Sequence, residues 1–409
     1  MGLLLYHTFL RLYSLGIRVA SLWSPKARLW LSGRTIPLPQ FTNKTIWFHC
    51  ASLGEFEQGR PLLEAIKKLY PQYPVVLTFF SPSGYEIRKN YSLAEKVLYL
   101  PLDGSSRSTT FIKHINPAIV LWIKYEFWYY YLKELHSKQI PVLLVSAIFR
   151  PSQPFFKFYG KFWKRMLANF HQLFVQDKSS KELLAQINLL EKVTISGDTR
   201  FDRVIEITQQ LKSLPEIEAF CLNNQVIVAG STWEEDEEIW KHYTKKHPEI
   251  KFIIAPHEVD ENNIREVLKR FPSACLYSEL FKEKAGCNIL IINNIGLLNK
   301  LYAYAHITYI GGGFRDSGIH NTLEAAAYSK PVIFGPVYEK FREAVQLIKC
   351  GGAVSIQSAL ELESVLDELW KNSNDREKMG NNSGTFVHQN TGATQTILHY
   401  IQENRLLIN

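Results

Sequence analysis

The stretch that decides the fold is residues 307–336, ITYIGGGFRDSGIHNTLEAAAYSKPVIFGP. An apolar run is followed by three consecutive glycines, then by a helical stretch that carries Glu324, and then by a second apolar run. A strand, a loop, a helix and another strand in this order are the repeating unit of a parallel α/β sheet. The stretch therefore predicts an α/β fold.

Apolar runs of the same kind recur along the chain. They are continuous rather than alternating, which indicates strands buried on both faces of a parallel sheet. After a polar, helical stretch near residues 203–222 the pattern restarts, so we predict two doubly wound domains that face each other across a cleft and are joined near those residues. The runs are TIWFHC, PVVLTFF, VLYLPL, AIVLWI, PVLLVSA, QLFVQD and KVTISG before that stretch, and QVIVAG, KFIIAP, ILIINN, ITYIGGG and PVIFGP after it.

The composition fits a chain of two ordinary cores. The chain has 409 residues, 46% of them hydrophobic, which is enough for two domains of typical size. The five cysteines are odd in number and form no CxxC pair, so we expect neither a zinc site nor a disulfide framework, and a reducing compartment fits best. No nucleic-acid-binding motif is visible, and nucleic acid is not an expected partner.

The net charge of +8 is concentrated at the N-terminus. Residues 1–54 hold six Lys and Arg and no Asp or Glu, which gives +6 of the +8. The first segment, MGLLLYHTFLRLYSLGIRVASLW, is apolar for most of its length but is interrupted by Arg11 and Arg18, which share one helix face. We predict a helix that lies in the interface of an anionic membrane. The alternatives are a terminal helix packed on the protein's own core and, less in keeping with the two arginines, a single membrane span.

Two loops of the first domain carry candidate residues. The run TIWFHC ends in ASLGE, where Ser52, Gly54 and the following amides are expected to form a strand-to-helix turn. Glu55, the first carboxylate of the chain, could accept a proton there; the alternative is a first-turn carboxylate that interacts only with the helix dipole. Lys124 and Glu126 follow another strand, and a surface ion pair with Lys124 or Lys133 is the alternative for Glu126.

Two loops of the second domain could bind a phosphate. Gly230, Ser231 and Thr232 precede five consecutive acids, which we predict to be a solvated helix start. Small hydroxyl residues at a helix N-terminus can bind phosphate, although they are also ordinary N-caps. The three glycines of 311–313 allow close approach of a ligand but do not match GxGxxG. A helix beginning near Asn321 could face the phosphate while Glu324 holds a ribose; an Asn cap with a capping Glu is the compatible alternative.

Taken together, ASLGE, EFW, GDTRFD, AGSTWEEDE and the 307–336 stretch resemble, in order and spacing, the 3-deoxy-D-manno-octulosonic acid (Kdo) transferases, glycosyltransferase family 30. The resemblance covers the whole chain and implies a GT-B fold. It implies transfer of Kdo from CMP-Kdo to the 6-hydroxyl of a lipid A precursor in lipopolysaccharide synthesis. It also implies monotopic or peripheral attachment to the cytoplasmic face of the inner membrane, whose anionic lipid surface is then a partner.

The resemblance also implies domains and residue roles. Residues 1–24 become the membrane helix, 25–205 the acceptor domain, 206–395 the CMP-Kdo domain, and 396–409 a helix returning to the first domain. Glu55 becomes the general base of an inverting reaction and Glu126 a second catalytic carboxylate. No DxD triplet is present, so neither a metal nor another cofactor is expected. The expected donor ligands are Ser231, Thr232, His257, Gly312, Gly313, Asn321 and Glu324, and the expected acceptor or phosphate ligands are Ser52, Gly54, Arg60, Lys124 and Arg200.

Two departures from the family pattern affect these roles. The family's Arg-His pair is replaced by IIAPHEVD, which leaves the contact of His257 open, and the family's ELWP appears as Glu126-Phe127-Trp128-Tyr129 without its proline. The alternative functions are another GT-B enzyme that uses a UDP-sugar, which should lack ASLGE, and a non-enzymatic peripheral membrane protein.

Overall fold

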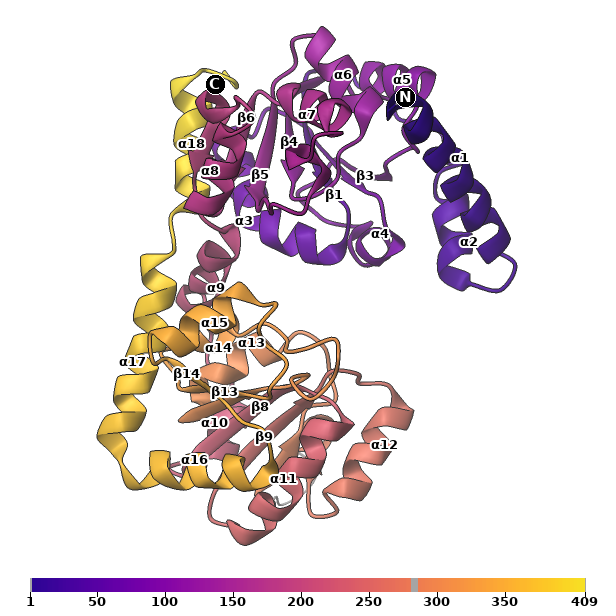
Figure 1. The fold of residues 1–409 in the computed structure, drawn as a ribbon. Helices are drawn as coiled ribbons and strands as arrows, with labels where there is room; N and C mark the ends of the chain where they lie inside the picture. Colours follow the sequence, from indigo (N-terminus) through magenta and orange to yellow (C-terminus); the bar gives the residue numbers. More distant parts are fainter. Residues whose placement is uncertain (1, 281–285, 409) are drawn as a thin grey trace. The chain divides into compact units, whose positions relative to one another are not determined.

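The computed structural model describes residues 2–280 and 286–408 (Figure 1). The chain folds as two compact units: unit 1 consists of Met1–Arg203 and Thr391–Asn409, and unit 2 of Val204–Asn390. The sequence placed these boundaries at residues 205/206 and 395/396. The stretch near 203–222 contains two helices, α9 (Thr199–Gln209) and α10 (Pro215–Cys221).

The sheet of unit 1 has seven parallel strands in the order β3-β2-β1-β4-β5-β6-β7. The strand order reverses between β1 and β4, and ligands of doubly wound sheets bind beside the carboxyl ends of the strands at such a point. The strands are β1 (Thr45–Cys50), β2 (Val75–Phe79), β3 (Lys96–Tyr99), β4 (Pro117–Ile123), β5 (Val142–Ala147), β6 (Gln172–Val175) and β7 (Val193–Ile195).

Helices cover both faces of this sheet. Successive residues of β1 point to opposite faces, so Trp47 joins one buried cluster and Phe48 the other. The helices of unit 1 are α1 (Gly2–Ala20), α2 (Pro25–Ser32), α3 (Leu53–Leu69), α4 (Pro82–Arg88), α5 (Ser105–Ile115), α6 (Tyr129–Ser137), η1 (Pro154–Phe156), α7 (Lys161–Ala168), α8 (Lys178–Ala185), η2 (Leu190–Lys192) and α18 (Ala393–Glu403).

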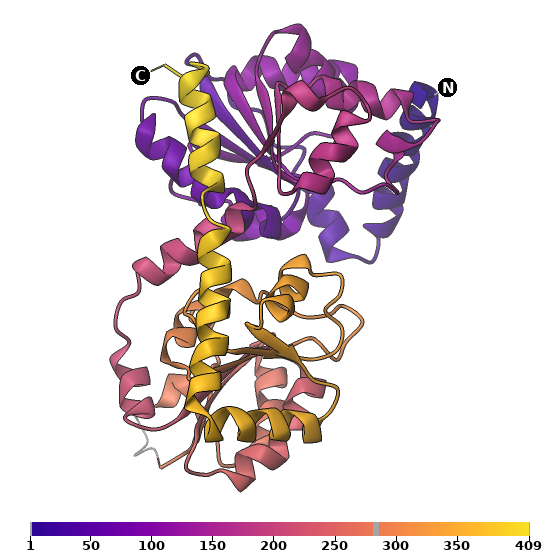
Figure 2. The same cartoon turned by 60° about the vertical axis from the view of Figure 1, so that its left-hand side comes forward.

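The last helix, α18, belongs to unit 1 although 187 residues of unit 2 precede it (Figure 2). Its residues Ile397 and Ile401 are fully buried in the cluster that contains Phe48. The turn before it is held by Asp202, whose two carboxylate oxygens accept hydrogen bonds from the backbone N–H groups of Gly392 and Thr394, both at 2.6 Å. This one carboxylate therefore fixes the point at which the chain re-enters unit 1.

Unit 2 repeats the architecture with seven parallel strands in the order β10-β11-β9-β8-β12-β13-β14. Here the reversal lies between β8 and β12. The strands are β8 (Val226–Thr232), β9 (Lys251–Pro256), β10 (Cys275–Leu276), β11 (Ile289–Ile291), β12 (Ile307–Ile310), β13 (Val332–Phe334) and β14 (Ala353–Ser355). The remaining helices are α11 (Glu234–Lys246), α12 (Glu261–Arg270), η3 (Tyr277–Glu279), α13 (Leu298–Leu301), η4 (Tyr302–Tyr304), α14 (Leu323–Ala326), α15 (Arg342–Lys349), α16 (Ala359–Lys371) and α17 (Ser373–Gln389).

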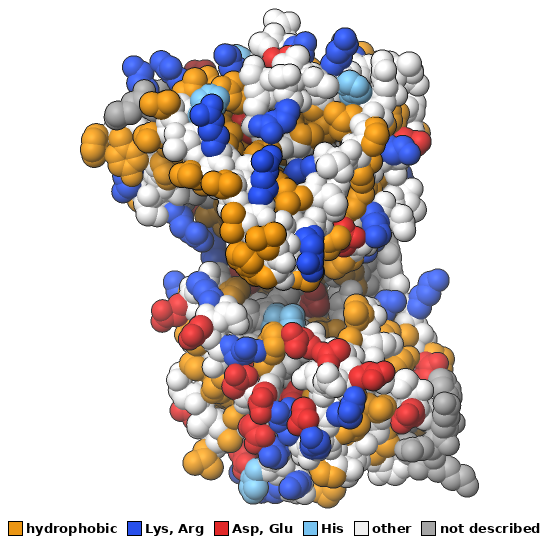
Figure 3. All heavy atoms as spheres, turned by 90° about the vertical axis from the view of Figure 1, so that its right-hand side faces the viewer, with side chains coloured by type: hydrophobic (Ala, Val, Ile, Leu, Met, Phe, Trp, Pro, Cys, Tyr) orange, Lys and Arg blue, Asp and Glu red, His pale blue; other side chains and the backbone are white. Residues whose placement is uncertain are grey.

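Helix α1 is docked on unit 1 by one face only. Tyr6 and Leu10 are buried in a small cluster with Trp30, and the Tyr6 hydroxyl donates to the Asp103 carboxylate at 2.6 Å. The opposite face exposes Leu4, Leu5, Phe9, Leu12, Leu15 and Val19. On the side of the molecule shown in Figure 3, hydrophobic and basic side chains predominate over unit 1. In the described part of the chain, every helix is too short or too polar to cross a membrane.

The structure corrects the prediction for two cysteines. Cys275 and Cys287 form a disulfide with a Cα–Cα distance of 6.2 Å, whereas the cysteine count indicated none. The physical reason is the pairing of β10 with β11, which brings together two chain segments that the spacing alone did not connect. Cys50 and Cys221 are buried free thiols.

Candidate functional site

Glu55 lies in the first turn of α3, directly after the carboxyl end of β1. Its carboxylate turns back and accepts a hydrogen bond from the Ala51 N–H. Burial, and next the negative charge of Glu126, raise the pKa of Glu55 to about 7, although the N–H groups of Ala51 and Ser52 and the charge of Lys124 oppose the shift. A carboxyl group with this pKa can take up and release a proton near neutral pH.

Glu126 lies in the loop after β4, the strand that neighbours β1. Its Oε2 atom is 2.8 Å from Nε2 of His49 and accepts a hydrogen bond from the Trp128 indole N–H at 3.1 Å. The Trp122 indole N–H donates to the Glu126 backbone carbonyl at 2.7 Å. The structure therefore brings the two predicted catalytic carboxylates to neighbouring strand ends, within electrostatic reach of each other.

The GDTR segment after β7 forms a second polar cluster at the same edge of the sheet. Asp198 is almost fully buried and accepts from the Gln58 side-chain amide at 2.6 Å. It also holds Arg200, whose backbone N–H and guanidinium both donate to it at 2.9 Å. Tyr125 interacts electrostatically with Asp198, Arg200 and Glu55, which connects this cluster to the carboxylate pair.

Of the other predicted ligands of unit 1, some lie close to Glu55 and one lies farther along α3. Ser52 is the N-cap residue of α3, and Lys124, at φ 60°, interacts electrostatically with Glu55. Gly54 is exposed on the first turn of α3. Arg60 instead lies farther along α3 and is paired with Glu57 and Glu64 of the same helix. Its guanidinium therefore has local partners on the helix.

Unit 2 contains a stack of planar side chains. His257, directly after β9, stacks on both Trp233 and His320, with ring centroids 4.7 and 4.3 Å away. The Arg315 guanidinium lies 4.0 Å from the ring centroid of Trp233. Burial, and next His257, lower the pKa of His320 to about 4. An indole N–H can only donate, so the 3.0 Å contact of Trp233 makes Nε2 of His320 an acceptor and leaves this imidazole neutral.

The acids that follow Thr232 are not all solvated, so that prediction is wrong for two of them. Asp236 and Glu237 are buried. Asp236 accepts from the Gly312 N–H, the Tyr309 hydroxyl and the Trp233 N–H, and Glu237 pairs with Arg270 at 2.9 Å. These two acids lie on the inner face of α11, where hydrogen bonds and a cation compensate for the loss of solvent.

The predicted hydroxyl and glycine ligands of unit 2 have contacts within the protein. Ser231 has a left-handed backbone at φ 53°, and the Thr232 hydroxyl donates to Glu237 at 3.1 Å. Gly312 also has a positive φ, 89°, and its N–H donates to Asp236. A Cβ on Gly313 would lie 2.5 Å from the backbone nitrogen of Gly335. The glycines are therefore needed for close packing of backbone on backbone.

Asn321 and Glu324 lie together, as their spacing suggested. The Asn321 amide donates to Glu324 at 3.0 Å, while its oxygen accepts from the Leu323 N–H at 3.2 Å. The predicted helix beginning near Asn321 is only one turn, α14 (Leu323–Ala326). It ends before Ser329, which has a left-handed backbone at φ 54°.

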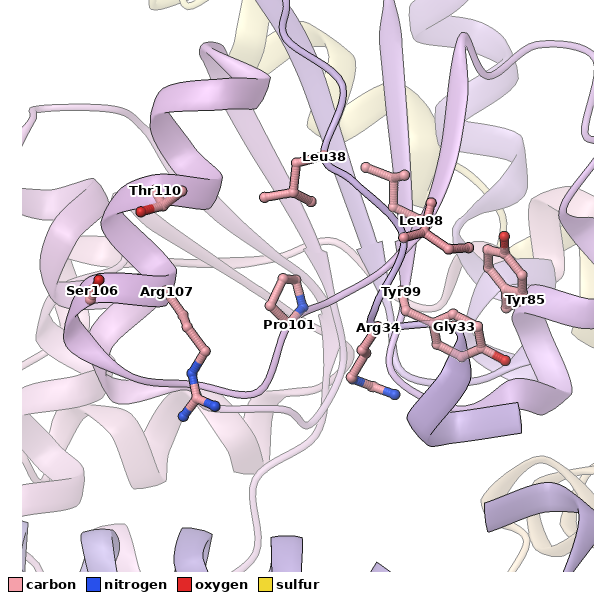
Figure 4. Close-up of a pocket in the computed structure, with 11 residues that line it drawn as sticks. Gly33, Arg34, Leu38, Tyr85, Leu98, Tyr99, Pro101, Ser106, Arg107 and Thr110 are labelled. Carbon is pink, nitrogen blue, oxygen red and sulfur yellow. The ribbon is translucent and has the colours of Figure 1, made fainter. Parts of the chain in front are cut away.

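Two hollows of unit 1 lie apart from the carboxylate pair. One, of about 270 Å³, has Arg34 and Arg107 beside the largely apolar walls of Leu38, Leu98 and Tyr99 (Figure 4). The other, of about 410 Å³, is a groove between α1 and the start of α5, and its basic lining residues are His7, Arg11, Arg18 and Arg107. We call the second hollow the basic groove. Its one acid, Asp103, already accepts hydrogen bonds from Tyr6, Tyr130 and Tyr131.

Sequence reasoning missed several residues of these clusters. His49, Gln58, Asp198, Trp233 and Arg315 were not among the predicted ligands. For His49 the signal was a titratable residue inside a largely apolar strand, as the fifth residue of that strand. Groups of three or more His, Cys, Asp or Glu side chains that could hold a metal do not occur among residues 2–280 and 286–408.

The comparisons with known proteins point to the family that the sequence motifs resemble. Residues 26–203 match the family model "3-Deoxy-D-manno-octulosonic-acid transferase (kdotransferase)". The chain is 26% identical to the 3-deoxy-D-manno-octulosonic acid transferase of Haemophilus influenzae, with 94% of each chain covered. It is 28% identical to that of Rickettsia bellii over 84% of each chain, and 26% identical to that of Aquifex aeolicus over 79% of this chain and 85% of the relative.

Solved structures show the fold. The UDP-GlcNAc 2-epimerase of Neisseria meningitidis has a TM-score of 0.61 at 17% identity, covering 88% of this chain and all of its own. A putative UDP-N-acetylglucosamine 2-epimerase of Listeria monocytogenes has a TM-score of 0.59 at 16% identity, covering 90% and 98%. The predicted GT-B fold class is confirmed by this likeness and by the two parallel sheets. The family model and the relatives likewise confirm that the chain resembles the Kdo transferases over nearly its whole length.

Proposed function

We propose that this protein transfers Kdo from CMP-Kdo to a glucosamine 6-hydroxyl of a lipid A precursor, with Glu55 as general base. The observation that carries the proposal is the position and proton affinity of Glu55. It follows β1 where the strand order reverses, it has Glu126 within electrostatic reach, and its pKa is about 7. The similarity to a 3-deoxy-D-manno-octulosonic acid transferase along 94% of the chain supports Kdo as the transferred group.

The step is a single displacement. The Glu55 carboxylate takes the proton of the acceptor hydroxyl as its oxygen forms a bond to the anomeric carbon of Kdo. The bond from that carbon to the phosphate oxygen of CMP breaks on the opposite face, and CMP leaves with the electron pair. One displacement inverts the anomeric centre and needs no covalent enzyme intermediate. The charge of Glu126 raises the proton affinity of Glu55.

For the donor we propose the carboxyl edge of unit 2. The stack of His257, Trp233 and His320 offers flat surfaces and ring nitrogens beside the loop of residues 311–313. Arg315 brings a positive charge to this stack and could offset the charge of the leaving phosphate. Ser231, Asn321 and Glu324 remain the candidates for phosphate and ribose contacts. The mechanism we propose needs no metal or other cofactor.

For the acceptor we propose unit 1. Arg200 is oriented by Asp198, and its positive charge at this sheet edge can attract an anionic group of the lipid. Lys124 and Arg200 lie at the same sheet edge as Glu55, whereas the partners of Arg60 on its own helix make it the weakest of the predicted ligands.

The test measures Kdo transfer and CMP release with CMP-Kdo and a tetraacyl lipid A precursor. We expect Glu55→Gln to lower kcat at least about 100-fold, the usual contribution of a general base. Glu57→Gln is the matched control, because this carboxylate is two residues away on the same helix and is paired with Arg88. No transfer by the parent, transfer from UDP-GlcNAc instead, or equal kcat for Glu55→Gln and the parent would refute the proposal.

We further propose that α1 holds the protein on the anionic cytoplasmic face of the inner membrane. Its exposed apolar face would enter the headgroup boundary, and the arginines of the basic groove would meet lipid phosphates beside it. Vesicle co-sedimentation tests this without disturbing the docked face. Leu4→Asn/Leu12→Asn/Leu15→Asn should abolish binding, and Arg11→Ser/Arg18→Ser should abolish the preference for anionic over zwitterionic vesicles. Unchanged binding by the triple variant would place the membrane surface elsewhere.

A further inference from the structure

His49 is a fully buried imidazole that none of the predicted roles uses. It lies at the next-to-last position of β1 with 0% of its surface exposed. Its Nε2 atom is 2.8 Å from Oε2 of Glu126, and its Nδ1 atom is 2.8 Å from the Thr78 hydroxyl oxygen. The ring thus joins β2 to the loop after β4. There it contacts Glu126, the carboxylate whose negative charge raises the pKa of Glu55.

The contacts of the two ring nitrogens indicate where the His49 proton lies. The Trp47 indole N–H can only donate, and it does so to the Thr78 hydroxyl oxygen at 2.8 Å. The single hydroxyl proton of Thr78 then has two acceptors, Nδ1 of His49 at 2.8 Å and the Phe48 carbonyl at 3.5 Å. A carboxylate can only accept, so Nε2 of His49 carries a proton and donates to Glu126, and in the neutral ring Nδ1 then accepts from the Thr78 hydroxyl.

This arrangement gives one carboxylate oxygen two donors. Oε2 of Glu126 receives Nε2–H of His49 and the indole N–H of Trp128. Donors of this kind stabilise the ionised form of a carboxyl group. The charge of Glu126 in turn raises the proton affinity of Glu55, for which it is the second cause after burial.

We propose that His49 is a positioning residue of the transfer reaction, a neutral Nε2–H imidazole that fixes Glu126 as a carboxylate beside Glu55. The inference rests on the proposed function in which Glu55 is the base. It assigns to His49 an action through Glu126 and no contact with substrate. Its consequence is that the pH at which Glu55 becomes ionised depends on a side chain buried behind the site.

Other charged and titratable groups face the same pair. From the loop after β4, Lys124 and Tyr125 interact with Glu55. From α1 and the segment after α2, Tyr13 and Arg34 interact with Glu126. Cys50, on β1, interacts with both carboxylates, and burial first, then these charges, raise the pKa of its thiol. All of them are present in both His49 variants described below, so the comparison of the two variants isolates the hydrogen bond.

Two substitutions separate the hydrogen bond from the space that the ring fills. His49→Gln can place an amide N–H where Nε2–H lies and keeps the donor to Glu126, whereas His49→Leu fills the space without a donor. Without the donor the Glu126 carboxylate is desolvated and less well compensated, so it takes up a proton more readily. Glu55 then has a neutral neighbour and ionises at lower pH. The pH below which kcat/KM falls should therefore also move to a lower value.

The direct test is carbon-13 NMR of the full chain labelled at the glutamate carboxyls, with Glu55→Gln and Glu126→Gln for assignment. We expect His49→Leu to lower the midpoint of Glu55 by at least about one pH unit, a tenfold change in proton affinity, and to raise that of Glu126. His49→Gln should leave Glu55 near its parent value. An unchanged Glu55 midpoint in folded His49→Leu, or the same shift in both variants, would overturn the proposal.

A measurement on the parent keeps the proposal falsifiable if His49→Leu does not fold. Nitrogen-15 shifts of the ring should report a neutral His49 protonated at Nε2 at pH 7, and a ring protonated at Nδ1 would overturn the assignment. Neither NMR experiment requires activity. If the midpoints shift as expected but no Kdo is transferred, the proposed function fails while the contact stands; if Kdo is transferred and the midpoints do not shift, the role of His49 fails alone.

Discussion

Glu55→Gln should stabilise the fold of unit 1 above pH 7 while it removes activity. The pKa of Glu55 is about 7 in the folded chain against 4.5 for an ordinary glutamate. Below pH 4.5 the group is protonated in both the folded and the unfolded chain and makes no difference. Between pH 4.5 and 7 the unfolded chain ionises first, so the free energy of unfolding falls as the pH rises. Above pH 7 this cost is complete and constant.

The size of the effect follows from the shift. A difference of about 2.5 pKa units corresponds to about 3.4 kcal/mol at most. A glutamine keeps an oxygen that can accept from the Ala51 N–H but loses the stronger, charge-assisted form of that bond, so we expect a net gain of about 1–3 kcal/mol at pH 8.5. At pH 5 the cost of the buried carboxylate, and hence the gain, is less than about 1 kcal/mol.

Urea unfolding followed by tryptophan fluorescence at pH 5 and pH 8.5 measures both values. Because a chain of two units need not unfold in one step, the transition assigned to unit 1 is the one to compare. Glu182→Gln, which replaces an exposed carboxylate of α8, is the control and should change little at either pH. A gain from Glu55→Gln that is equal at the two pH values, or a loss at pH 8.5, would show that the raised proton affinity of Glu55 is wrong.

Three further outcomes follow from the same contacts. The kcat/KM of the parent should fall about tenfold for each pH unit below about 7, because the base must be ionised, and a flat profile from pH 5 to 8 would contradict this. Trp233→Leu removes the indole from the His257 stack and the donor to His320, so the KM for CMP-Kdo should rise about tenfold or more with a smaller effect on kcat; an unchanged KM would exclude this stack as the donor site. Asp202→Ala leaves the N–H groups of Gly392 and Thr394 without their acceptor, which should cost about 1–3 kcal/mol and expose the turn at 391–394 to protease, whereas resistance equal to the parent would show that α18 is held by packing alone.

The alternation of apolar runs and helical stretches made the two sheets predictable. Each of the runs identified in the sequence overlaps a strand, and TIWFHC coincides with β1 (Thr45–Cys50). Strands buried on both faces consist almost entirely of apolar residues, and that is a strong signal over five to seven positions. The strands that were missed, β10 (Cys275–Leu276) and β14 (Ala353–Ser355), lie at the two edges of the unit 2 sheet. These two strands are two and three residues long and only partly buried, so the sequence shows no continuous apolar run that would predict them.

The neighbouring positions of the candidate site residues were predictable for the same reason, whereas the side chains that contact them were not. Loops after parallel strands meet at one sheet edge, so Glu55 and Glu126 could be assigned to neighbouring positions. The groups that fix their chemistry come from far along the chain: His49 is 77 positions from Glu126, and Asp198 is 140 positions from Gln58. A run of five acids looks solvated when it is read as composition, yet Asp236 is buried because Gly312 and Tyr309, more than 70 positions later, supply its donors.

The loop around Glu126 shows how local side-chain contacts can take the place of a proline. The Kdo transferases that the chain resembles have ELWP at this point, and this chain has Tyr129 where the proline would stand. Here the turn is held by side chains: the Trp122 indole N–H donates to the Glu126 carbonyl, and the Trp128 indole N–H donates to its carboxylate. Because both indoles approach from within the same seven-residue segment, the loop is fixed from its own sequence. His49 therefore contacts a carboxylate whose loop is already held in place. The effect that we propose for His49 is on the charge of Glu126 and not on the path of this loop.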